Sequence, residues 1–248
     1  YRMVGSSQSV AGPNIYINGA VAQVLEEAAD RLEAAEDVEL ECHNIIRDFY
    51  QNHKRIVFNG NGYSKEWKAE AKRRGLPQFP DTVSALPQMA NDASIALFEG
   101  QQILSRSEVE SRLEIYLQTY SKQINIEASV MVEMCRKQII PAVTQYLSHL
   151  ADSITAQERI GLAAPEQKKT AQLLNNSLEL AIAETELLHI ALAKALTHTD
   201  DPQLQAELYR DEVAAQMQVL RSHVDLLETY TDRAHWPLPS YDDLLFRL

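Results

Sequence analysis

The amino-acid sequence predicts a mainly α-helical protein. Its 248 residues include only eight Gly and nine Pro, and long stretches contain no Pro at all. Such stretches favour long helices, because a Pro inside a helix costs about 3 kcal/mol. Apolar residues recur at helical spacing, and they rarely alternate with the period of two that a strand requires, so a large sheet is not expected. The Pro-free spans are 14–76, 88–140, 166–201 and 203–236.

The first third of the chain predicts one long helix followed by a short one. Asn14 is placed to cap a helix over about 15–53. The NGNG sequence at 59–62 marks a turn, Ser64 can cap the short helix, and Gly75 ends it. The expected apolar face of the long helix consists of Val21, Val24, Leu25, Ala28 and Leu32.

A loop and a second long helix are expected in the middle of the chain. Three Pro residues make the stretch 77–87 mostly loop. Ser105 and Glu108 form a capping-box pattern, in which each side chain satisfies a backbone N–H of the other residue. A helix should follow to about Ser153. Pro141 should kink it, because the bond to the carbonyl four residues back is lost.

The last third predicts an antiparallel helical hairpin. Pro165 and Pro202 each stand where a first-turn Pro belongs, and the HTDDP connection between the two runs is short. The tail at 236–246 is rich in Pro and aromatic residues and is expected to dock on the protein. The expected seams are Leu174, Leu178, Ala181, Leu188, Leu192 and Leu196 in the first arm, and Leu204, Leu208, Ala215, Val219 and Leu226 in the second.

Charge and composition exclude several classes of protein. The chain has 35 acidic and 23 basic residues and a net charge of −12, which argues against binding to duplex nucleic acid or to an anionic membrane. No apolar run approaches the roughly 20 residues that a membrane-spanning helix needs. Cys42 and Cys135 are the two cysteines, too few for a disulfide-stapled secreted scaffold. We therefore expect a cytoplasmic protein without nucleic-acid or membrane partners.

One pattern resembles part of a metal site. Glu186 and His189 have the Glu-x-x-His spacing of di-iron helix bundles, which place two such pairs and two further Glu around the metals. Only Asp232 and His235 imitate a second pair, and His235 directly precedes Trp236 and a Pro, outside the helix. We therefore expect no metal site. A ferritin-like metal protein remains the alternative that these residues would support.

Nucleophilic and phosphate-binding patterns are weak. Cys42 and His43 are adjacent, so on a helix they point about 100° apart and cannot pair. Cys135 has no nearby His, and both cysteines are expected to be ordinary packing residues. The turn at 59–62 lacks the Lys-Ser/Thr of a phosphate loop. The basic run KRR at 72–74 is expected to be a solvated helix end.

The start of the chain carries the one candidate binding residue. Tyr1 and Arg2 are expected to end a strand, beside a Gly/Ser loop at 4–14 that precedes a helix. Backbone N–H groups at such a place can hold an anion, although a capped turn is the simpler interpretation. The Arg2 guanidinium could bind a carboxylate or phosphate through two hydrogen bonds.

These segments together resemble the C-terminal part of a type III glutamine synthetase. The opening YRMVGSSQSVAGPN (1–14) is similar to the end of that family's catalytic domain. Similarity continues in the same order to the tail, and only the acidic stretch between 165 and 232 matches less distinctively. The other matching segments are RIVFNGNGYSKEW (55–67), RRGLP (73–77), TVSALP (82–87), LSRSEVESRLEIYLQTYSKQINIEASVMVEMCRKQIIPAV (104–143) and WPLPSYDDLLF (236–246).

The resemblance implies both a fold and an enzyme. Residues 1–63 would close the catalytic α/β domain, and residues 64–248 would form a long-helix C-terminal domain with an antiparallel hairpin. The family joins ammonia to L-glutamate with ATP through γ-glutamyl phosphate, using divalent metals, Mg²⁺ or Mn²⁺. Identical subunits assemble in stacked hexameric rings, so the apolar seams would pack within or between subunits. Replacing Leu188 and Leu192 with Asp is then expected to weaken oligomers.

Only Arg2 can be assigned a functional role by this resemblance. The family's last catalytic strand has a Glu-aromatic-Arg pattern, in which the Glu binds metal and the Arg contacts glutamate or its phosphate. Tyr1 and Arg2 match the last two positions, and the Glu would precede Tyr1. No catalytic or metal-binding residue is therefore expected in this chain, which should be inactive alone and part of a longer polypeptide. The alternative is a free-standing helical scaffold or oligomerisation module without catalysis.

Overall fold

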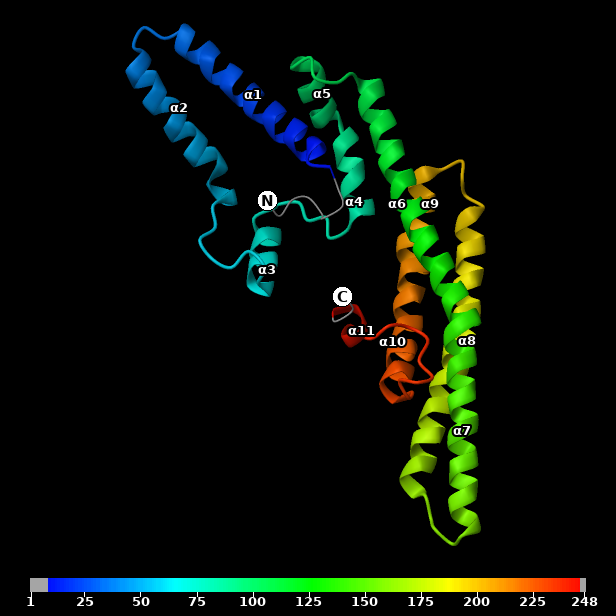
Figure 1. The fold of residues 1–248 in the computed structure, drawn as a ribbon. Coiled ribbons are helices and arrows are strands. Elements are labelled where there is room, and N and C mark those ends of the chain that lie inside the picture. Colours follow the sequence, from blue (N-terminus) through cyan, green and yellow to red (C-terminus); the bar gives the residue numbers. More distant parts are fainter. Residues whose placement is uncertain (1–8, 246–248) are drawn as a thin grey trace. The chain divides into compact units, whose positions relative to one another are not determined.

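The structure, a computed structural model, describes residues 9–245 and divides the chain into two compact units, Tyr1–Leu113 and Glu114–Leu248 (Figure 1). All regular elements between residues 9 and 245 are helical, so the mainly α prediction is confirmed. None of these helices is long and apolar enough to cross a membrane. The strand expected at Tyr1–Arg2 lies outside the described residues.

The first unit begins with a helical hairpin instead of the single helix expected over 15–53. Helix α1 spans Ala11–Glu33, and helix α2 spans Val38–His53. Asp37 starts α2, because its side chain accepts a hydrogen bond from the backbone N–H of Leu40 at 3.0 Å. Asn14 is not the cap of the first helix; it lies inside α1, which already begins at Ala11.

A small apolar core joins α1 to the next helices. Phe98 is fully buried, and the ring of Tyr16 meets it edge to face with centroids 4.9 Å apart. Gly19 lets the side chain of Ile103 approach α1 closely, since a Cβ there would lie 2.9 Å from Cδ1 of Ile103. This core is completed by Ile95, Val109 and Leu104.

Helix α3, Lys65–Arg73, has the predicted ends. Ser64 accepts a hydrogen bond from the Trp67 backbone N–H at 3.1 Å, and Gly75 takes a positive φ of 68° after the last turn. The short 3₁₀ element η1, Lys54–Ile56, precedes the turn at 59–62.

The stretch 77–87 is not mostly loop, contrary to expectation. It contains α4, Thr82–Ala85, and the start of the 3₁₀ element η2, Leu86–Ala90, and α5, Asp92–Gly100, follows at once. Two side-chain caps explain this. Asp81 accepts from the backbone N–H of Ser84 at 2.9 Å, and Asn91 accepts from that of Ser94 at 2.8 Å.

Helix α6, Arg106–Met134, continues from the first unit into the second. The expected capping box is present: the Ser105 backbone N–H donates to Oε2 of Glu108 at 2.8 Å, and the Glu108 N–H donates to Oγ of Ser105 at 3.4 Å. Just before Pro141, where the sequence predicts a kink, the structure has a π-helical segment, η3, Cys135–Ile139. Helix α7, Ile140–Arg159, follows and runs past the end expected at Ser153.

The second unit is a bundle around α8, Pro165–Leu196. Helix α8 packs against α7, and the chain then turns at 197–201 and returns along α8 as α9, Pro202–Leu208, the π-helical segment η4, Tyr209–Ala214, and α10, Ala215–Tyr230 (Figure 1). Asp201 caps α9 through the Leu204 N–H at 3.0 Å. The main core is formed by Val132, Cys135, Val143, Leu174, Leu178, Ala181, Leu188, Leu192, Tyr209, Val213, Leu220 and Leu227.

The first expected seam is correct, and the second is mostly wrong, since Leu208 is its one residue that packs against the main core. Of the first, only Leu196 is exposed, at 51%. In the returning arm, Leu204 and Val219 are exposed, whereas the buried residues are Ala206, Tyr209, Val213, Leu220 and Leu227. This arm carries apolar residues on two faces, and spacing alone does not tell which face meets α8.

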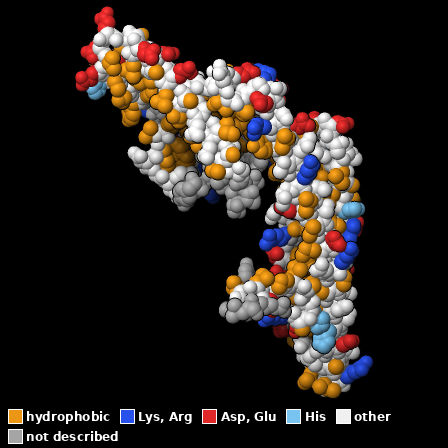
Figure 2. Space-filling view, turned by 45° about the horizontal axis from the view of Figure 1, so that its top comes forward, with side chains coloured by type: hydrophobic (Ala, Val, Ile, Leu, Met, Phe, Trp, Pro, Cys, Tyr) orange, Lys and Arg blue, Asp and Glu red, His pale blue; other side chains and the backbone are white. Residues whose placement is uncertain are grey.

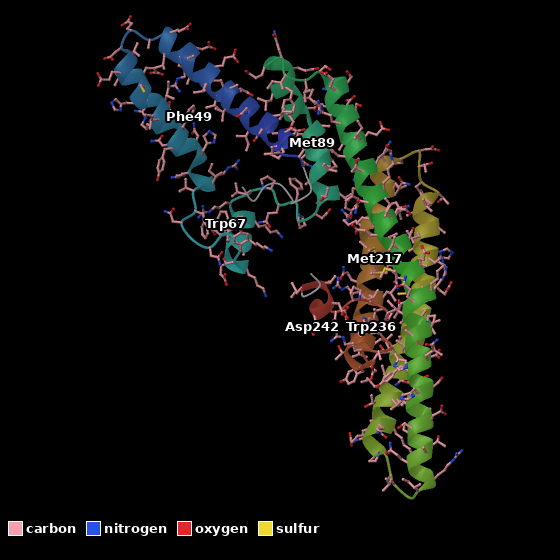
Figure 3. All side chains as sticks on the ribbon, viewed as in Figure 1. Phe49, Trp67, Met89, Met217, Trp236 and Asp242 are labelled. Atoms are coloured by element: carbon pink, nitrogen blue, oxygen red, sulfur yellow. The ribbon has the colours of Figure 1, made fainter. Side chains whose placement is uncertain are left out.

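The tail ends on the second unit. Trp236 packs against the main core, and α11, Tyr241–Leu245, follows (Figure 3). Asp243 accepts hydrogen bonds from both the N–H and the hydroxyl of Ser240, at 2.9 and 2.8 Å. These two bonds hold the pKa of Asp243 below its usual range, helped by the nearby Arg233 guanidinium.

Candidate functional site

The predicted binding residue, Arg2, lies outside the described residues, as do residues 4–8 of the loop expected at 4–14, and residues 11–14 are not loop but the first turn of α1. Within the described end of that loop, Ser9 Oγ accepts a hydrogen bond from the Ala11 N–H at 3.2 Å, just where α1 begins. The bond ties the residue before the N-cap to the first residue of α1, and the N-cap residue Val10 makes no side-chain capping hydrogen bond. The assignment of Arg2 therefore stays a prediction.

The Glu-x-x-His pattern does not form a metal site in the part of the chain that the structure describes. Glu186 and His189 are exposed on α8, and Oε1 of Glu186 accepts from the Arg136 guanidinium at 2.8 Å. His235 lies in the turn after α10, with its ring 5.8 Å from that of His149. Between residues 9 and 245, no three His, Cys, Asp or Glu side chains come together where they could hold a metal ion.

Both cysteines are unpaired. Cys42 is exposed on α2, and Cys135 is buried in η3. Burial raises the pKa of the Cys135 thiol, and a hydrogen bond with Thr185 only partly opposes this effect. Cys135 is therefore a neutral core thiol and not a nucleophile.

The basic run at 72–74 is more than a solvated helix end. The Arg74 guanidinium donates to the carbonyl oxygens of Arg55 and Val57 at 3.1 and 2.9 Å, and its carbon lies 5.5 Å from the centroid of the Trp67 ring. Trp67, labelled in Figure 3, in turn lies beside the residue on which its ring stacks, Phe58, with centroids 4.1 Å apart. We call these contacts the Arg74 clamp; they close the turn at 59–62 as a structural unit.

Glu70 holds the clamp in place. Its carboxylate accepts from the guanidinium groups of Arg73 and Arg74, in each case at 2.6 Å. These bonds lower the pKa of Glu70 to about 2, with Arg73 the larger cause. The i, i+4 spacing of Glu70 and Arg74 is the sequence signal that could have revealed this role.

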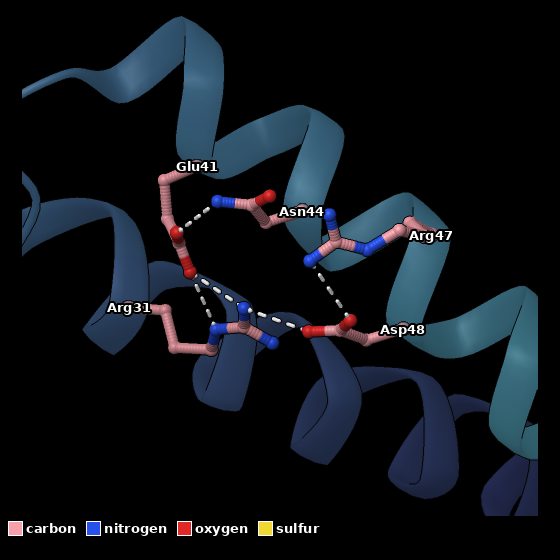
Figure 4. Close-up of polar contacts among 5 residues, drawn as sticks. All are labelled: Arg31, Glu41, Asn44, Arg47 and Asp48. Carbon is pink, nitrogen blue, oxygen red and sulfur yellow. Dashed lines mark hydrogen bonds and ion pairs between the residues drawn. The ribbon is translucent and has the colours of Figure 1, made fainter.

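A second charge network fastens α1 to α2 (Figure 4). The Arg31 guanidinium donates to Oε1 of Glu41 at 2.8 Å and to Oδ2 of Asp48 at 3.1 Å. Asn44 and Arg31, in that order, hold the pKa of Glu41 below its usual range. Each of these three charges already has a partner on the neighbouring helix, so the cluster stabilises the hairpin and offers no free acid or base.

One shallow hollow of about 480 Å³ lies between α7 and α8. It offers no carboxylate, imidazole or thiol, and the ammonium of Lys168 is already paired with Glu158. The hollow is lined by Leu147, Ala151, Ile154, Lys168, Ala171, Gln172 and Asn175.

Comparison with known proteins identifies a matching family and several relatives of this chain. Residues 41–158 match the family model described as the glutamine synthetase C-terminal domain. A type-3 glutamine synthetase of Dictyostelium discoideum is 33% identical over 99% of this chain, and a glutamine synthetase of Bacteroides fragilis is 29% identical over 99%. A glutamine synthetase of Butyrivibrio fibrisolvens is 31% identical over 87% of the chain.

The match is partial in length. The chain spans 35% of the first two relatives and 31% of the third. The similarity to the first two runs through both compact units and leaves almost no part of the chain unmatched. The chain therefore belongs to the glutamine synthetase family and corresponds to the C-terminal portion of its type-3 members.

Proposed function

We propose that this chain works as the C-terminal portion of an ATP-dependent glutamate–ammonia ligase. The observation that carries the proposal is the 33% identity to a type-3 glutamine synthetase over 99% of the chain. The intact enzyme would convert glutamate, ammonia and ATP to glutamine through γ-glutamyl phosphate. Mg²⁺ or Mn²⁺ would neutralise the charge that develops on the transferred phosphoryl group.

We propose that residues 1–63 close the catalytic domain and that residues 64–248 form the helical C-terminal domain. The exposure of apolar side chains on α1 supports the proposal that residues 1–63 belong to the catalytic domain. Ile17, Val21, Val24 and Leu25, which we call the α1 apolar stripe, are 44–63% exposed, and only Gly19 of this helix is buried. Figure 2 shows hydrophobic side chains gathered over the α1–α2 hairpin on the visible face. A helix face of this kind is expected to pack against the rest of a catalytic domain.

The proposed site lies at the start of the chain. Arg2 would bind glutamate or its phosphate through two parallel N–H···O bonds, and the metal ligands and nucleotide site would come from residues before Tyr1. Identical subunits would assemble into stacked hexameric rings. The enzyme would work in the cytoplasm, in agreement with two cysteines that are both unpaired.

The first experiment is the denatured mass of the native polypeptide, isolated with an antibody to residues 236–246. The same preparation is assayed for phosphate release that requires glutamate, ammonia and ATP together. We expect a mass far above 28.0 kDa and activity in that preparation, with no activity from residues 1–248 produced alone. A native mass near 28.0 kDa would favour the free-standing scaffold, and ligase activity of residues 1–248 alone would contradict the proposed division of the site.

A further inference from the structure

Helix α8 carries a second apolar seam that the described residues of its own unit leave uncovered. We call it the outer stripe: Leu173, Asn176, Leu180, Ala183, Leu187 and Ile190, all exposed. The four large side chains are 37%, 47%, 50% and 62% exposed, in chain order. Their spacing of three and four residues in alternation is that of a coiled-coil seam.

The outer stripe points away from the packed side of α8. At 100° per residue, it is centred about 130° around the helix from the inner seam that contains Leu174, Ala181 and Leu188. That inner seam meets α7 and α10. A helix with one apolar stripe needs one partner face, and α8 has two such stripes. Among residues 9–245, the outer stripe thus lacks the helix that its pattern is built to meet.

We propose that the outer stripe binds the same stripe of a second copy of this chain, with the two α8 helices antiparallel. The pattern is self-complementary about a two-fold axis between residues 181 and 182. Leu173 then faces Ile190 of the second copy, Asn176 faces Leu187, and Leu180 faces Ala183. If Leu173, Leu180 and Leu187 are the a positions of the heptads, then Asn176, Ala183 and Ile190 are the d positions. Every layer then pairs an a position of one helix with a d position of the other, as antiparallel coiled coils require.

Packing favours the antiparallel orientation over the parallel one. In a parallel pair, Ala183 would face Ala183 and leave a gap, and Asn176 would face Asn176. In the antiparallel pair, Leu180 fills the space above each Ala183 and lets the two backbones approach closely. The physical reason is the match of a large side chain to a small one in the central layers.

Charge favours the same orientation. A parallel pair would place Glu179 beside Glu184 of the other helix, an uncompensated like-charge contact. The antiparallel pair instead places Glu179 beside Glu186, whose carboxylate already accepts from Arg136 at 2.8 Å. The Arg136 guanidinium is 38% exposed, so further N–H groups are available to Glu179 of the second copy.

The interface is small, which sets its expected strength. Six positions on one helix bury less than the roughly 1,600 Å² of a standard stable interface. The contact should therefore be weak and reversible in the isolated chain. The contact would be stronger in an assembly that already holds several copies together, because the outer stripes of two copies then meet at a high effective concentration.

The first test is sedimentation velocity of residues 1–248 over concentrations up to about 1 mM, where even weak dimers form. We expect a monomer–dimer equilibrium whose dissociation constant rises at least about tenfold in the L180E/L187E double variant. The matched control is I182E, which adds charge at an exposed residue of the same helix outside the stripe, and it should leave the equilibrium unchanged. A monomer at every concentration, or equal loss of dimer in I182E, would overturn the proposal.

A second variant strengthens the contact instead of breaking it. Asn176 faces Leu187 in the proposed dimer, and a polar residue at such a seam position lowers coiled-coil stability. N176L should therefore tighten dimerisation by about tenfold or more, with unchanged circular dichroism. A tighter dimer cannot be explained by unfolding of the variant, because N176L adds apolar area and no charge. No tightening would contradict the proposed pairing.

Disulfide trapping tests the orientation. In a C42S background, which removes the exposed native thiol, the N176C/L187C double variant places two facing thiol pairs across the dimer, and oxidation should give a covalent dimer. The N176C single variant should not cross-link, because residues 176 of the two copies would be about 16 Å apart along the axis. Efficient cross-linking of N176C alone would refute the antiparallel arrangement.

Discussion

At the scale of single residues, side-chain hydrogen bonds decide where the helices begin and what lies beside them. The sequence pattern predicts one helix over about 15–53. Asp37 divides this stretch, because its carboxylate accepts a hydrogen bond from the Leu40 N–H and starts a new helix there. Arg74, which reads as a solvated cation, reaches back to two carbonyl oxygens at residues 55 and 57. Both effects depend on one polar group finding a specific backbone partner.

The Arg74 clamp should be sensitive to acid through Glu70. The folded-state pKa of Glu70, about 2, lies below the unfolded value of 4.5, so its contribution is fully present above pH 4.5 and is lost as the pH falls toward 2. We expect E70Q to lower the melting temperature slightly at pH 6 and to match the wild type near pH 2. Thermal unfolding followed by Trp fluorescence checks this. A difference that stays constant between pH 6 and pH 2 would contradict it.

The capping box at Ser105 gives a second prediction. S105A removes the acceptor of the Glu108 N–H at the start of α6, and we expect a loss of about 1 kcal/mol in the free energy of unfolding. The matched control is S148A, where an exposed Ser hydroxyl inside α7 donates to the Thr144 carbonyl. That change should be neutral, because Ala is the better helix former. Urea unfolding of both variants makes the comparison.

Arg2 is the residue whose replacement should affect catalysis in the intact enzyme. R2K keeps the positive charge but loses the planar pair of donors, so we expect kcat/KM to fall by about 100-fold. The native mass of the oligomer should not change, which separates a loss of binding from a loss of assembly. Wild-type kinetics in R2K would refute the role assigned to Arg2.

At the scale of elements, the helices of the second unit are positioned by buried seams. The inner seam of α8 fills the centre of that unit, with Leu174 and Leu188 fully buried. The test first suggested by the sequence, replacing Leu188 and Leu192 with Asp, would therefore place charge in the core of a single subunit. It would report unfolding of the bundle and not loss of contacts between subunits.

Two adjacent Leu residues of α8 belong to different seams: Leu187 lies on the outer stripe and Leu188 on the inner seam. L188A should lower the free energy of unfolding by about 3 kcal/mol, because it leaves a cavity in the packed core. L187A, one residue earlier on the exposed outer stripe, should change it by less than about 0.5 kcal/mol. Chemical denaturation at low micromolar protein, below the proposed dimerisation range, measures both. Equal losses would mean that the core does not lie where the structure places it.

At the scale of the whole molecule, the two units differ in how well they are packed. The second unit has a continuous core along α7, α8 and α10, whereas α1 and α2 each bury a single residue. Exposed apolar area on this scale is normally covered in a working protein. The difference agrees with a first unit that is completed by other parts of a longer enzyme.

The α1 apolar stripe provides the test at this scale. V21K/L25K changes two exposed side chains, so the melting temperature of residues 1–248 should hardly move. In the intact ligase the same change should be destabilising by about 2 kcal/mol or more, because two apolar side chains lose their buried contacts. A22K, an exposed position of α1 outside the stripe, is the control. Equal tolerance of both variants in the intact enzyme would contradict the proposed packing.

The mainly α class, the capping box, the inner seam of α8 and the family are all predictable from the amino-acid sequence, because local spacing and long matching segments carry that information. Tertiary packing determines where α1 and α2 are divided, which face of the returning arm is buried and which carbonyl groups Arg74 contacts. It also decided which Leu residues of α8 remain exposed. These features depend on which of several chemically similar faces meets a neighbour, and that choice is made by packing between distant segments rather than by local pattern.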